Sequence, residues 1–540
     1  MIGTEKVAGA MPTKELIKNH NIQEFFVSPT SYFTLKDFNA YDWDIEVNPE
    51  KQKEIDEFDI IIVGSGLGGL SCGAVLSNRG YKVLVLEQHS RVGGFCSSFK
   101  RNGFIFNVGL GRVTGLEEKG PIHYLCTNIG LKKDDYFVKY PTGVRFLYKG
   151  IDAHLSDTQS IKDLLSDLYP DENRNITTFF DDSEKAHDEF LKYADIYGVP
   201  LPKELILKAF GEEDLRKYEK ECPHYIDWAN KTIKQKLDEH FKNEKLKALI
   251  NDFLNYHGTK PTETAAFVIL RSLGFYRYGN YYSKGGAQRF VNSLKDFIKS
   301  RGGTFLVKHK VDKILIEKKI VKGVQVGEKI FRSPVVVSNA NAKATFLRLI
   351  DPKNLDDFFV DYAKGIRISS SGFIVFLGVD MDLSDYPVLT KNKDEGYQIL
   401  IASNVDRSSA PEGKASVRIW SAANYDDYPQ RGTPSYLQKK KELSEMLIKM
   451  AEKLISGLSN HILVQDAATP KTIERYTLMP EGSLEGLEET IENRKPCFKT
   501  PVKGLYLAGS STYPGGGIEL VIMSGLICAN DICKWQVDTK

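Results

Sequence analysis

Residues 59–70 read DIIIVGSGLGGL, and this stretch decides the fold of the 540-residue chain. Its apolar run is short and β-branched, which predicts a buried strand of a parallel sheet. Gly64, Gly66 and Gly69 then form the pattern G-x-G-x-x-G and open a helix predicted over residues 70–79. The first glycine permits a tight turn, the second lets the backbone approach a pyrophosphate, and the third lets the helix pack on the strand. The stretch therefore predicts a dinucleotide bound at the helix N-terminus.

An acidic residue follows the glycine-rich turn at the distance that ribose recognition requires. Gly80 ends the predicted helix, and residues 81–86 (YKVLVL) form the next strand. Glu87 stands at the tip of that strand, about 20 residues beyond the glycines, where its carboxylate can accept hydrogen bonds from an adenosine ribose. An ordinary α/β unit with a glycine-rich turn is the alternative, and it has no need of this acid.

The residues that follow Glu87 extend the unit. Gly93 and Gly94 form a second glycine pair, and residues 104–111 read FIFNVGLG, which includes Gly109. The whole pattern resembles the FAD-containing amine oxidase and phytoene desaturase superfamily. In that family the chain continues past the acid into a glycine doublet, wraps the adenosine and runs on towards the flavin ring. The resemblance implies FAD as the cofactor. The residue after the doublet is often Arg in the family and is Phe95 here, so one pyrophosphate contact differs.

A second glycine-rich helix start lies near the C-terminus. Residues 505–508 (LYLA) predict a buried strand, and the glycines 515–517 precede an apolar helix predicted from about Ile518. The N-terminus of that helix would face the pyrimidine edge of the flavin, where its dipole can stabilise negative charge. The block resembles the C-terminal signature of bacterial phytoene desaturases. Amine oxidases usually carry an acid after the glycine that Gly509 matches, whereas this chain has Ser510.

Further blocks resemble the same family. Residues 282–291 (YSKGGAQRFV) match its central Gly-Gly segment, Val311 matches a position that usually contacts adenine, and residues 335–341 (VVVSNAN) match a strand that returns from the FAD domain. Residues 406–414 (DRSSAPEGK) resemble a loop of carotenoid desaturases, isomerases and retinol-saturase-like proteins. The glycine-rich motif and the resemblance, which covers roughly residues 58–535, together predict these FAD-binding residues: Gly64, Gly66, Leu67, Gly68, Gly69, Glu87, Gln88, Gly93, Gly94, Gly109, Val311, Gly509, Ser510, Gly517 and Ile518.

Composition narrows the class of protein. A content of 41% hydrophobic and 27% charged residues is that of a soluble globular protein, and the length predicts at least two domains. The net charge of +2 gives no argument for nucleic acid binding. No apolar run approaches the roughly 20 residues that span a bilayer, and residues 1–30 do not resemble a secretory signal. The seven scattered cysteines suit reduced thiols in the cytoplasm and predict no metal site.

The expected fold is α/β, with a Rossmann-type FAD-binding domain of the amine oxidase-like, two-dinucleotide-binding-domain kind and an inserted α+β substrate domain. Residues 1–58 form an N-terminal extension, partly ordered near residues 25–41. The FAD domain is predicted from residues 59–150, 284–345 and 495–540, and the substrate domain from residues 151–283 (helical) and 346–494 (mixed sheet and helix). Apolar spacing predicts helices over 160–168, 181–197, 231–255, 262–273 and 436–455 and strands over 372–379, 398–402 and 416–420.

The chain contains no G-x-S-x-G, H-E-x-x-H or G-x-x-x-x-G-K-[ST] motif, so the flavin is expected to carry the chemistry. The resemblance implies an FAD-dependent oxidoreductase that desaturates or cis–trans isomerises a long apolar polyene, a carotenoid or retinoid-like isoprenoid, by hydride exchange. Such a substrate implies peripheral contact with a membrane. The alternatives are a retinol saturase-like enzyme, an oxidase or isomerase of an unsaturated fatty acid or amine, and a prenyl-binding protein like the Rab GDP-dissociation inhibitors. The direction of the redox chemistry and the oligomeric state stay open.

One residue departs from the desaturase pattern. Where carotenoid desaturases of this type usually have Pro after Gly-Gly-Gly-Ile, this chain has Glu519. In one interpretation Glu519 is an acid in the first turn of a helix, stabilised by about 0.3–1 kcal/mol. In the other it is a catalytic carboxylate at the substrate face of the flavin, which exchanges a proton with the polyene. The aromatic run 275–282 (FYRYGNYY) likewise has two interpretations, packing between the domains or lining an apolar tunnel.

Overall fold

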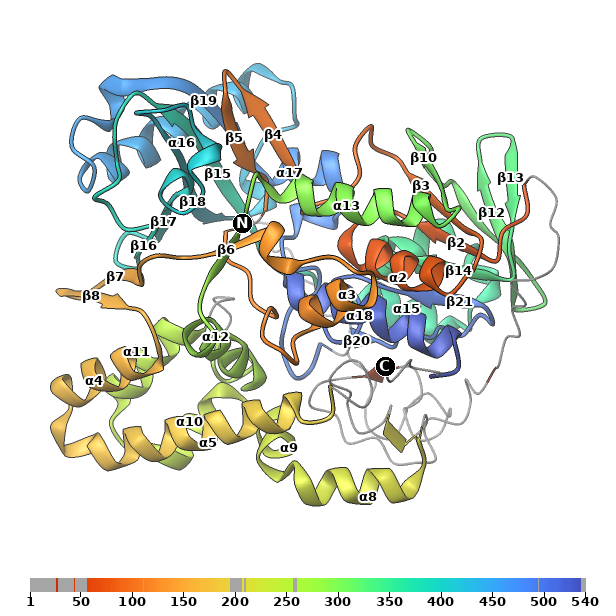
Figure 1. Ribbon diagram of the computed structural model, residues 1–540, viewed down its shortest axis with the longest axis horizontal. Coiled ribbons are helices and arrows are strands. Elements are labelled where there is room, and N and C mark those ends of the chain that lie inside the picture. Colours follow the sequence, from red (N-terminus) through yellow and green to blue (C-terminus); the bar gives the residue numbers. More distant parts are fainter. Residues whose placement is uncertain are drawn as a thin grey trace, which may run out of the picture.

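The computed structural model describes residues 26–27, 43, 56–109, 111–194, 206–207, 210–255, 260–493 and 495–535. The predicted order near residues 25–41 lies outside them, except for Phe26–Val27 (β1), which pairs antiparallel with Lys495–Pro496 (β20). Figure 1 shows three regions: a Rossmann-type unit at the right, a second sheet at the upper left and a helical region at the lower left. We call the last two together the substrate unit.

A parallel five-stranded sheet forms the centre of the Rossmann-type unit. Its order is β10 (Thr304–Val307), β3 (Val83–Glu87), β2 (Ile60–Val63), β14 (Val335–Ser338) and β21 (Leu505–Leu507). Both faces of the sheet are covered, which explains why its strands are continuously apolar. Ile60 and Ile62 point to one face and Ile61 and Val63 to the other, because successive side chains of a strand alternate.

Helices cover one face of this sheet, and a small antiparallel sheet with short helical segments covers the other. The first layer holds α2 (Leu67–Asn78), α3 (Pro121–Asn128), α13 (Ala287–Ser300) and α18 (Ile518–Ile532). The second layer holds β11 (Lys313–Glu317), β12 (Ile320–Val326), β13 (Lys329–Arg332), α14 (Ala342–Ala344), a π-helical turn (Thr345–Leu349) and α15 (Asp357–Gly365).

A seven-stranded sheet forms the upper part of the substrate unit. Its order is β19 (Ile462–Ala468), β15 (Ser371–Val379), β18 (Ala415–Ala423), β17 (Tyr397–Ile401), β16 (Leu389–Asn392), β7 (Val144–Tyr148) and β8 (Ile151–Leu155). All neighbours are antiparallel except β16 and β7, which are parallel. The long helix α16 (Pro434–Glu452) covers one face, packing against Phe373, Val375 and Leu377. Ile374 and Phe376 point to the other face, which is turned towards the Rossmann-type unit and packs on the hairpin of β4 (Ser98–Arg101) and β5 (Phe104–Asn107).

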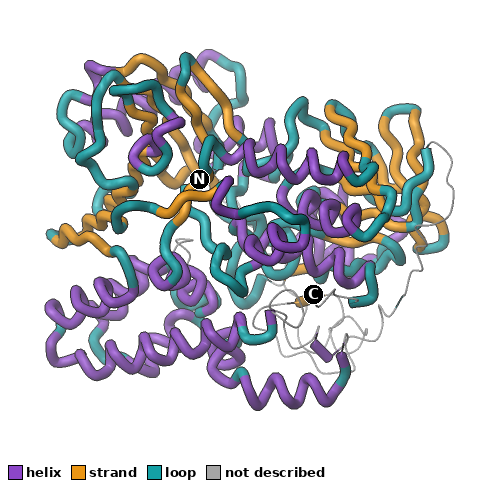
Figure 2. The backbone as a smooth tube through the Cα atoms, viewed as in Figure 1, coloured by secondary structure: helices purple, strands orange, loops and turns teal. Residues whose placement is uncertain are grey.

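Helices make up the lower part of the substrate unit, as the purple segments of Figure 2 show. They are α4 (Thr158–Leu168), α5 (Asn173–Leu191), α8 (Glu212–Glu221), α9 (Pro223–Ala229), α10 (Ile233–His240), α11 (Glu244–Leu254) and α12 (Phe267–Arg277). Three further elements are short: β6 (Phe137–Lys139) pairs antiparallel with β9 (Tyr281–Ser283), and α17 (Pro470–Thr477) packs beside β15 and β19.

The structure differs from several of the sequence-based boundaries. Strand β7, expected in the FAD domain that ended at residue 150, pairs with β16 and so belongs to the substrate sheet. Residues 345–365, expected in the substrate domain, pack in the second layer of the Rossmann-type unit. The helix predicted over 231–255 is two helices, because Phe241 turns extended and is buried, and Asn243 then caps α11 by accepting hydrogen bonds from two backbone N–H groups.

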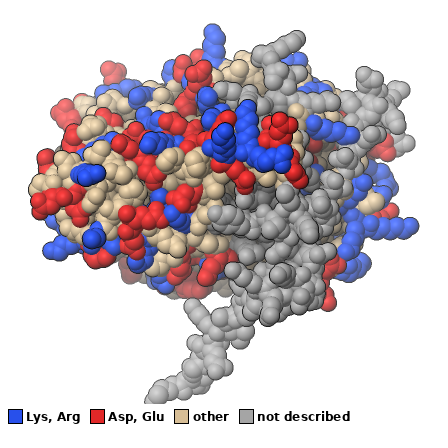
Figure 3. Space-filling model, turned by 90° about the horizontal axis from the view of Figure 1, so that it is seen from below, with Lys and Arg blue, Asp and Glu red and all other residues tan. Residues whose placement is uncertain are grey.

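Acidic and basic side chains are intermixed on one face of the molecule (Figure 3). In Figure 3 acidic and basic side chains are intermixed over the coloured part of the face that is seen from below, in line with the net charge of +2. Within the described ranges, no helix has the length and apolar character that crossing a bilayer requires. All seven cysteines lie in described residues, where they are buried and form no disulfide.

Candidate functional site

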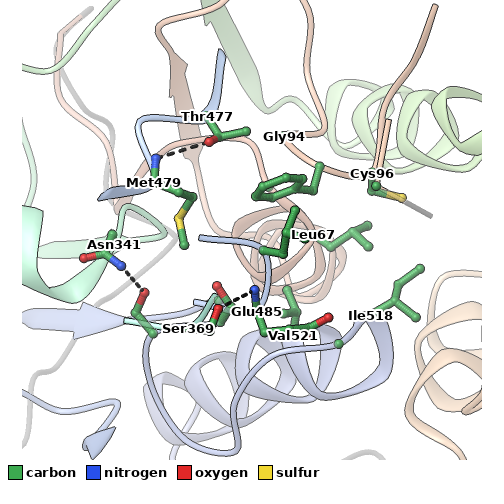
Figure 4. Close-up of a pocket in the computed structure, with 18 of the residues that line it drawn as sticks. Leu67, Gly94, Cys96, Asn341, Ser369, Thr477, Met479, Glu485, Ile518 and Val521 are labelled. Atoms are coloured by element: carbon green, nitrogen blue, oxygen red, sulfur yellow. Dashed lines mark hydrogen bonds between the residues drawn. The ribbon is translucent and has the colours of Figure 1, made fainter. Parts of the chain in front are cut away.

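A large cavity lies between the Rossmann-type unit and the substrate unit. Its volume is about 1120 Å³, above the roughly 300–1,000 Å³ of a typical ligand pocket, so it can hold a dinucleotide and part of a second ligand. Leu67 at the start of α2 and Ile518 and Val521 at the start of α18 line it on one side, and Met479 lines it on another (Figure 4).

The structure brings almost all of the predicted cofactor residues together in this cavity. Those that line it are Gly64, Gly66, Leu67, Glu87, Gln88, Gly93, Gly94, Gly109, Val311, Gly509, Ser510, Gly517 and Ile518, and Glu519 lines it as well. Gly68 and Gly69 do not line it. A Cβ on Gly68 would lie 2.6 Å from the Gly509 nitrogen, and one on Gly69 would lie 2.7 Å from the Gly64 oxygen, so these two glycines allow close packing of α2 instead.

The turn between β2 and α2 is built to receive a pyrophosphate. Gly64 has a φ of +91°, which L side chains rarely adopt, and Gly66 has no side chain with which to cap the N-terminus of α2. A Cβ on Gly66 would lie 2.5 Å from Asn339 Nδ2, and the Gly69 N–H donates to Asn339 Oδ1 at 3.1 Å. Asn339 thus holds the turn from the end of β14. Sequence reasoning quoted this segment but did not single out the asparagine.

Glu87 is fixed at the tip of β3. Its carboxylate accepts hydrogen bonds from the Ser65 N–H at 2.9 Å, the Ser65 hydroxyl at 2.6 Å and the His89 N–H at 2.7 Å. These three hydrogen bonds hold the carboxylate in place, and Glu87 lines the cavity. The His309 N–H donates to the Glu87 carbonyl at 2.8 Å, which brings Val311 to the same end of the cavity. The arrangement fits an adenosine.

The opposite end of the cofactor region is formed by the start of α18. Gly517, with a φ of +95°, precedes this helix and leaves its first N–H groups open to the cavity. The Gly509 N–H donates to Ser524 Oγ at 2.7 Å, and Gly525 contacts the backbone of Gly68, so α18 packs tightly against α2. The N-termini of α2 and α18 therefore both face one cavity. Glycines stand beside each of them at positions where a side chain would not fit. These residues fit FAD.

A cluster of charged side chains surrounds the glycine run before α18. Arg271 of α12 lies 3.4 Å from Glu519 Oε1, and each of the two side chains is 13% exposed. Glu489 and Lys495 form a buried ion pair, and Lys495 Nζ donates to the Pro514 carbonyl at 3.0 Å. Of these residues, sequence reasoning identified only Glu519. The sequence does contain an indication that Arg271 belongs to a site, because it is the only charged residue in the apolar run at 266–275.

Glu485 belongs to this cluster and lines the cavity, where its N–H donates to Ser369 Oγ at 2.9 Å (Figure 4). Burial raises the pKa of Glu485 to about 6, and the nearby charges of Glu519 and Glu489 raise it while Arg271 lowers it. A carboxyl group with this pKa can hold or release a proton near neutral pH. By contrast, burial raises the pKa of the Cys96 thiol, which also lines the cavity, to about 12, so this thiol stays protonated.

The substrate sheet forms the far wall of the cavity. Apolar side chains there include Ile374, Leu389, Leu400 and Trp420, and cationic side chains stand among them. The aromatic run 275–282 divides between its two interpretations, because Phe275 lines the cavity while Tyr276 and Tyr282 pack in the core. Among the described residues, no group of three or more His, Cys, Asp or Glu side chains could hold a metal ion.

Comparison with solved structures shows the same fold. An oxidoreductase from Methanosarcina mazei superposes with a TM-score of 0.61 at 18% identity, over 88% of this chain and 100% of that one. Putrescine oxidase superposes with a TM-score of 0.60 at 13% identity, over 88% and 99% of the two chains. The expected architecture, an amine oxidase-like flavoprotein fold with an added substrate domain, is confirmed.

Comparison with curated proteins confirms the family resemblance. The all-trans-retinol 13,14-reductase of Danio rerio is 26% identical over 517 residues, covering 84% of this chain and 82% of its own. The chloroplastic prolycopene isomerase of Daucus carota is 27% identical over 529 residues, covering 88% and 80%. The 4,4'-diapophytoene desaturase of a Methylomonas species is 25% identical over 505 residues, covering 88% and 95%. Residues 67–533 match the family described as flavin containing amine oxidoreductase, and the chain belongs to this family, with FAD as its cofactor.

Proposed function

We propose that this enzyme desaturates or cis–trans isomerises a long apolar polyene of the carotenoid or retinoid type. The observation that carries the proposal is the single cavity that joins the FAD-binding turns to the apolar wall of the substrate sheet. A polyene lying against that wall would meet the start of α18, where the flavin ring is expected. The names of the related proteins, a retinol reductase, a prolycopene isomerase and a diapophytoene desaturase, support this substrate class.

Some residues of the chain would bind the cofactor, and others would bind the substrate or transfer a proton to it. Bound FAD would supply hydride exchange with a substrate carbon. The uncapped start of α2 would bind the pyrophosphate and Glu87 the ribose, while the dipole of α18 would stabilise negative charge at the pyrimidine edge. The apolar wall would orient the chain of double bonds and exclude water. Glu519 and Glu485 would hold or transfer a proton at the substrate, because both line the cavity beside α18.

An amine substrate is disfavoured by the charge of the cavity wall. Arg112 and Arg418 line the cavity on the substrate side, and their positive charges would repel an ammonium ion placed beside them. Ser510 in place of the acid usual in amine oxidases agrees with this. Saturation of a double bond uses the same cavity and the same cofactor, and the experiment below separates it from desaturation and isomerisation.

An insoluble polyene must reach the cavity from a membrane, so we propose peripheral membrane contact at the cavity opening. Tyr476 and Leu478 both line the cavity, and their side chains are 49% and 42% exposed. Exposed apolar side chains at an opening can enter the boundary between lipid headgroups and acyl chains.

The test is product analysis with the FAD-loaded protein and liposomes that contain phytoene, a poly-cis carotene or all-trans-retinol. Each substrate is incubated with oxidised FAD and, under anaerobic conditions, with FAD reduced beforehand. A longer conjugated system formed only with oxidised FAD indicates desaturation. A change at constant mass with reduced FAD indicates isomerisation, and a gain of two hydrogens indicates saturation. If none of the three substrates changes while FAD stays bound, the polyene proposal is wrong.

A further inference from the structure

We propose that Glu485 takes up a proton from solvent when the bound FAD is reduced, so that the charges beside α18 couple the two events. The inference rests on FAD as the cofactor and on the start of α18 as the place of the flavin ring, and it holds for any substrate class. We call the charged side chains at this place the charge cluster. Its members are Arg271, Glu485, Glu489, Lys495 and Glu519.

The charge cluster packs directly on the glycine run that precedes α18. A Cβ on Gly516 would lie 2.7 Å from Glu485 Oε2, and a Cβ on either neighbouring glycine would also meet charged side chains. Those side chains are Glu489 and Lys495 at Gly515, and Arg271 and Glu519 at Gly517. The glycine run therefore makes room for charges, and these charges lie at the helix start beside which the flavin ring is expected.

Two of the three carboxylates in the cluster have a cation as a direct partner. Glu489 pairs with Lys495, and Glu519 Oε1 lies 3.4 Å from Arg271 Nη2. The Glu485 carboxylate makes no hydrogen bond or ion pair with any residue in the described ranges. Burying a charge without a direct partner is costly, so Glu485 is the carboxylate of the cluster that is most stabilised by a proton.

The net charge of the cluster supports this assignment. With all groups ionised, three carboxylates face two cations, and the N-terminus of α18 adds only about half a positive charge. Burial raises the pKa of Glu485 to about 6, while Arg271 lowers it and Glu519 and Glu489 raise it. Above pH 6 the start of α18 is therefore net negative, and below it a proton on Glu485 removes one of the negative charges.

Reduction adds negative charge at the same place. A hydride transferred from a donor to FAD brings two electrons and one proton, so the flavin gains one negative charge. An ionised Glu485 repels this charge, whereas a protonated Glu485 does not. By linkage, reduction must raise the proton affinity of Glu485. Just above pH 6 the flavin thus accepts a hydride while Glu485 accepts one proton from solvent, and the net charge of the site is unchanged.

The test measures the midpoint potential of FAD in the full-length protein on both sides of pH 6, for the wild type and for Glu485→Gln. We expect parallel curves below about pH 6, where Glu485 is protonated in both redox states. Above it the wild-type potential should fall more steeply, by about 30 mV per pH unit, because one more proton accompanies two electrons. The wild-type curve should end about 30 mV or more below that of the variant, which corresponds to a tenfold or larger rise in proton affinity on reduction.

Infrared difference spectra give a second measurement. At neutral pH, reduction of the wild type should produce the C=O band of a newly protonated carboxyl group, and Glu485→Gln should lack this band. Glu485→Asp should keep it, because the carboxyl group is retained. A merely structural role of Glu485 would produce no such band. If Glu485→Gln does not retain FAD, the wild-type band and its presence in Glu485→Asp decide the matter.

Glu488→Gln is the matched control. Glu488 also lines the cavity, three residues along the chain, but its carboxylate pairs with Arg367 Nε at 2.7 Å. This variant should keep both the wild-type potential curve and the carboxyl band.

Three results would overturn the inference. They are wild-type and Glu485→Gln curves that stay parallel above pH 6, no carboxyl band on reduction of the wild type, and an equal effect of Glu488→Gln. None of them affects the polyene proposal, because an electrode supplies the electrons and no substrate is present. Failure of the polyene proposal in its own test would likewise leave this inference intact.

Discussion

The charge of Glu519 is balanced by Arg271, which reaches it from α12 across the start of α18. This ion pair links the substrate unit to the Rossmann-type unit at the point where the flavin ring is expected. The catalytic role of Glu519 stays a prediction. The Glu519 side chain lines the cavity, and its carboxylate lies beside the Arg271 guanidinium.

At the residue scale we expect Glu519→Gln to lower turnover about 100-fold or more if Glu519 transfers a proton, since positioned acids and bases contribute at least that much. FAD binding, measured by flavin absorbance, should stay intact, because the amide keeps the shape of the side chain. Glu519→Asp should recover part of the activity. Unchanged turnover in the FAD-loaded Gln variant would leave Glu519 with the helix-end role alone.

At the same scale, the raised pKa of Glu485 predicts that both activity and stability depend on pH. Because burial raises its pKa to about 6, the group is protonated below that pH and ionised above it. We expect kcat/KM to change slope near pH 6 and the Glu485→Gln variant to lose this inflection. The raised pKa also means that the stability contribution of the neutral carboxyl is present below about pH 4.5 and is lost as pH rises through 6. The wild-type Tm should therefore fall, relative to the variant, between about pH 4.5 and pH 6, and parallel Tm profiles would contradict this.

At the scale of elements, a single carboxylate ties three helices of the substrate unit together. Asp182 of α5 meets four side chains of α9 and α10: His224 at 2.7 Å, Trp228 at 2.8 Å, Lys236 at 3.0 Å and His240 at 3.5 Å. Although burial alone would raise it, hydrogen bonds from these side chains hold the pKa of Asp182 well below its usual range. Its stabilising effect is thus present above about pH 4 and is lost as pH falls below that.

Replacement of this carboxylate should destabilise the helical region. Asp182→Asn removes one of the three carboxylates that pair with Lys236, whose side chain is 3% exposed, and it removes a charged hydrogen-bond acceptor, so we expect a loss of about 2 kcal/mol in the free energy of unfolding. The neighbouring Asp181→Asn is the control, because Asp181 is 54% exposed and its ion pair with Lys162 should contribute below about 1 kcal/mol. Urea unfolding followed by circular dichroism measures both. Equal losses in the two variants would contradict the role of Asp182.

The boundaries of some helices and strands could be predicted from the sequence, and those of others could not. Strands β2 and β3 and helix α2 were predicted nearly to their ends, because glycines and apolar runs mark their limits locally. The break between α10 and α11 was missed. Helical spacing of apolar residues continues across it, and only the burial of Phe241 in the packed core and the cap at Asn243 show where the chain turns.

At the scale of the whole molecule, two exposed side chains, Tyr476 and Leu478, line the cavity, and the proposed entry of the substrate beside them is the property to test. We expect Leu478→Ser to lower turnover of a polyene supplied in liposomes about fivefold, since it removes apolar area from the opening. Turnover of the same polyene in detergent should be unchanged. Leu437→Ser is the control, because Leu437 is 58% exposed on α16 and does not line the cavity. Equal effects of both variants, or an effect in detergent, would contradict a membrane-facing opening.

The sequence by itself determined the FAD-binding half of the site. Gly64, Gly66 and Glu87 lie within one strand–helix–strand unit, and their spacing follows from the pyrophosphate and ribose that such a unit binds. Only the tertiary structure decided the substrate half. Lys391 and Arg418 come from different strands, and Arg271 and Glu519 from helices far apart in the chain. Strand register and helix packing bring them together, and both depend on contacts over long sequence separations that local spacing does not encode.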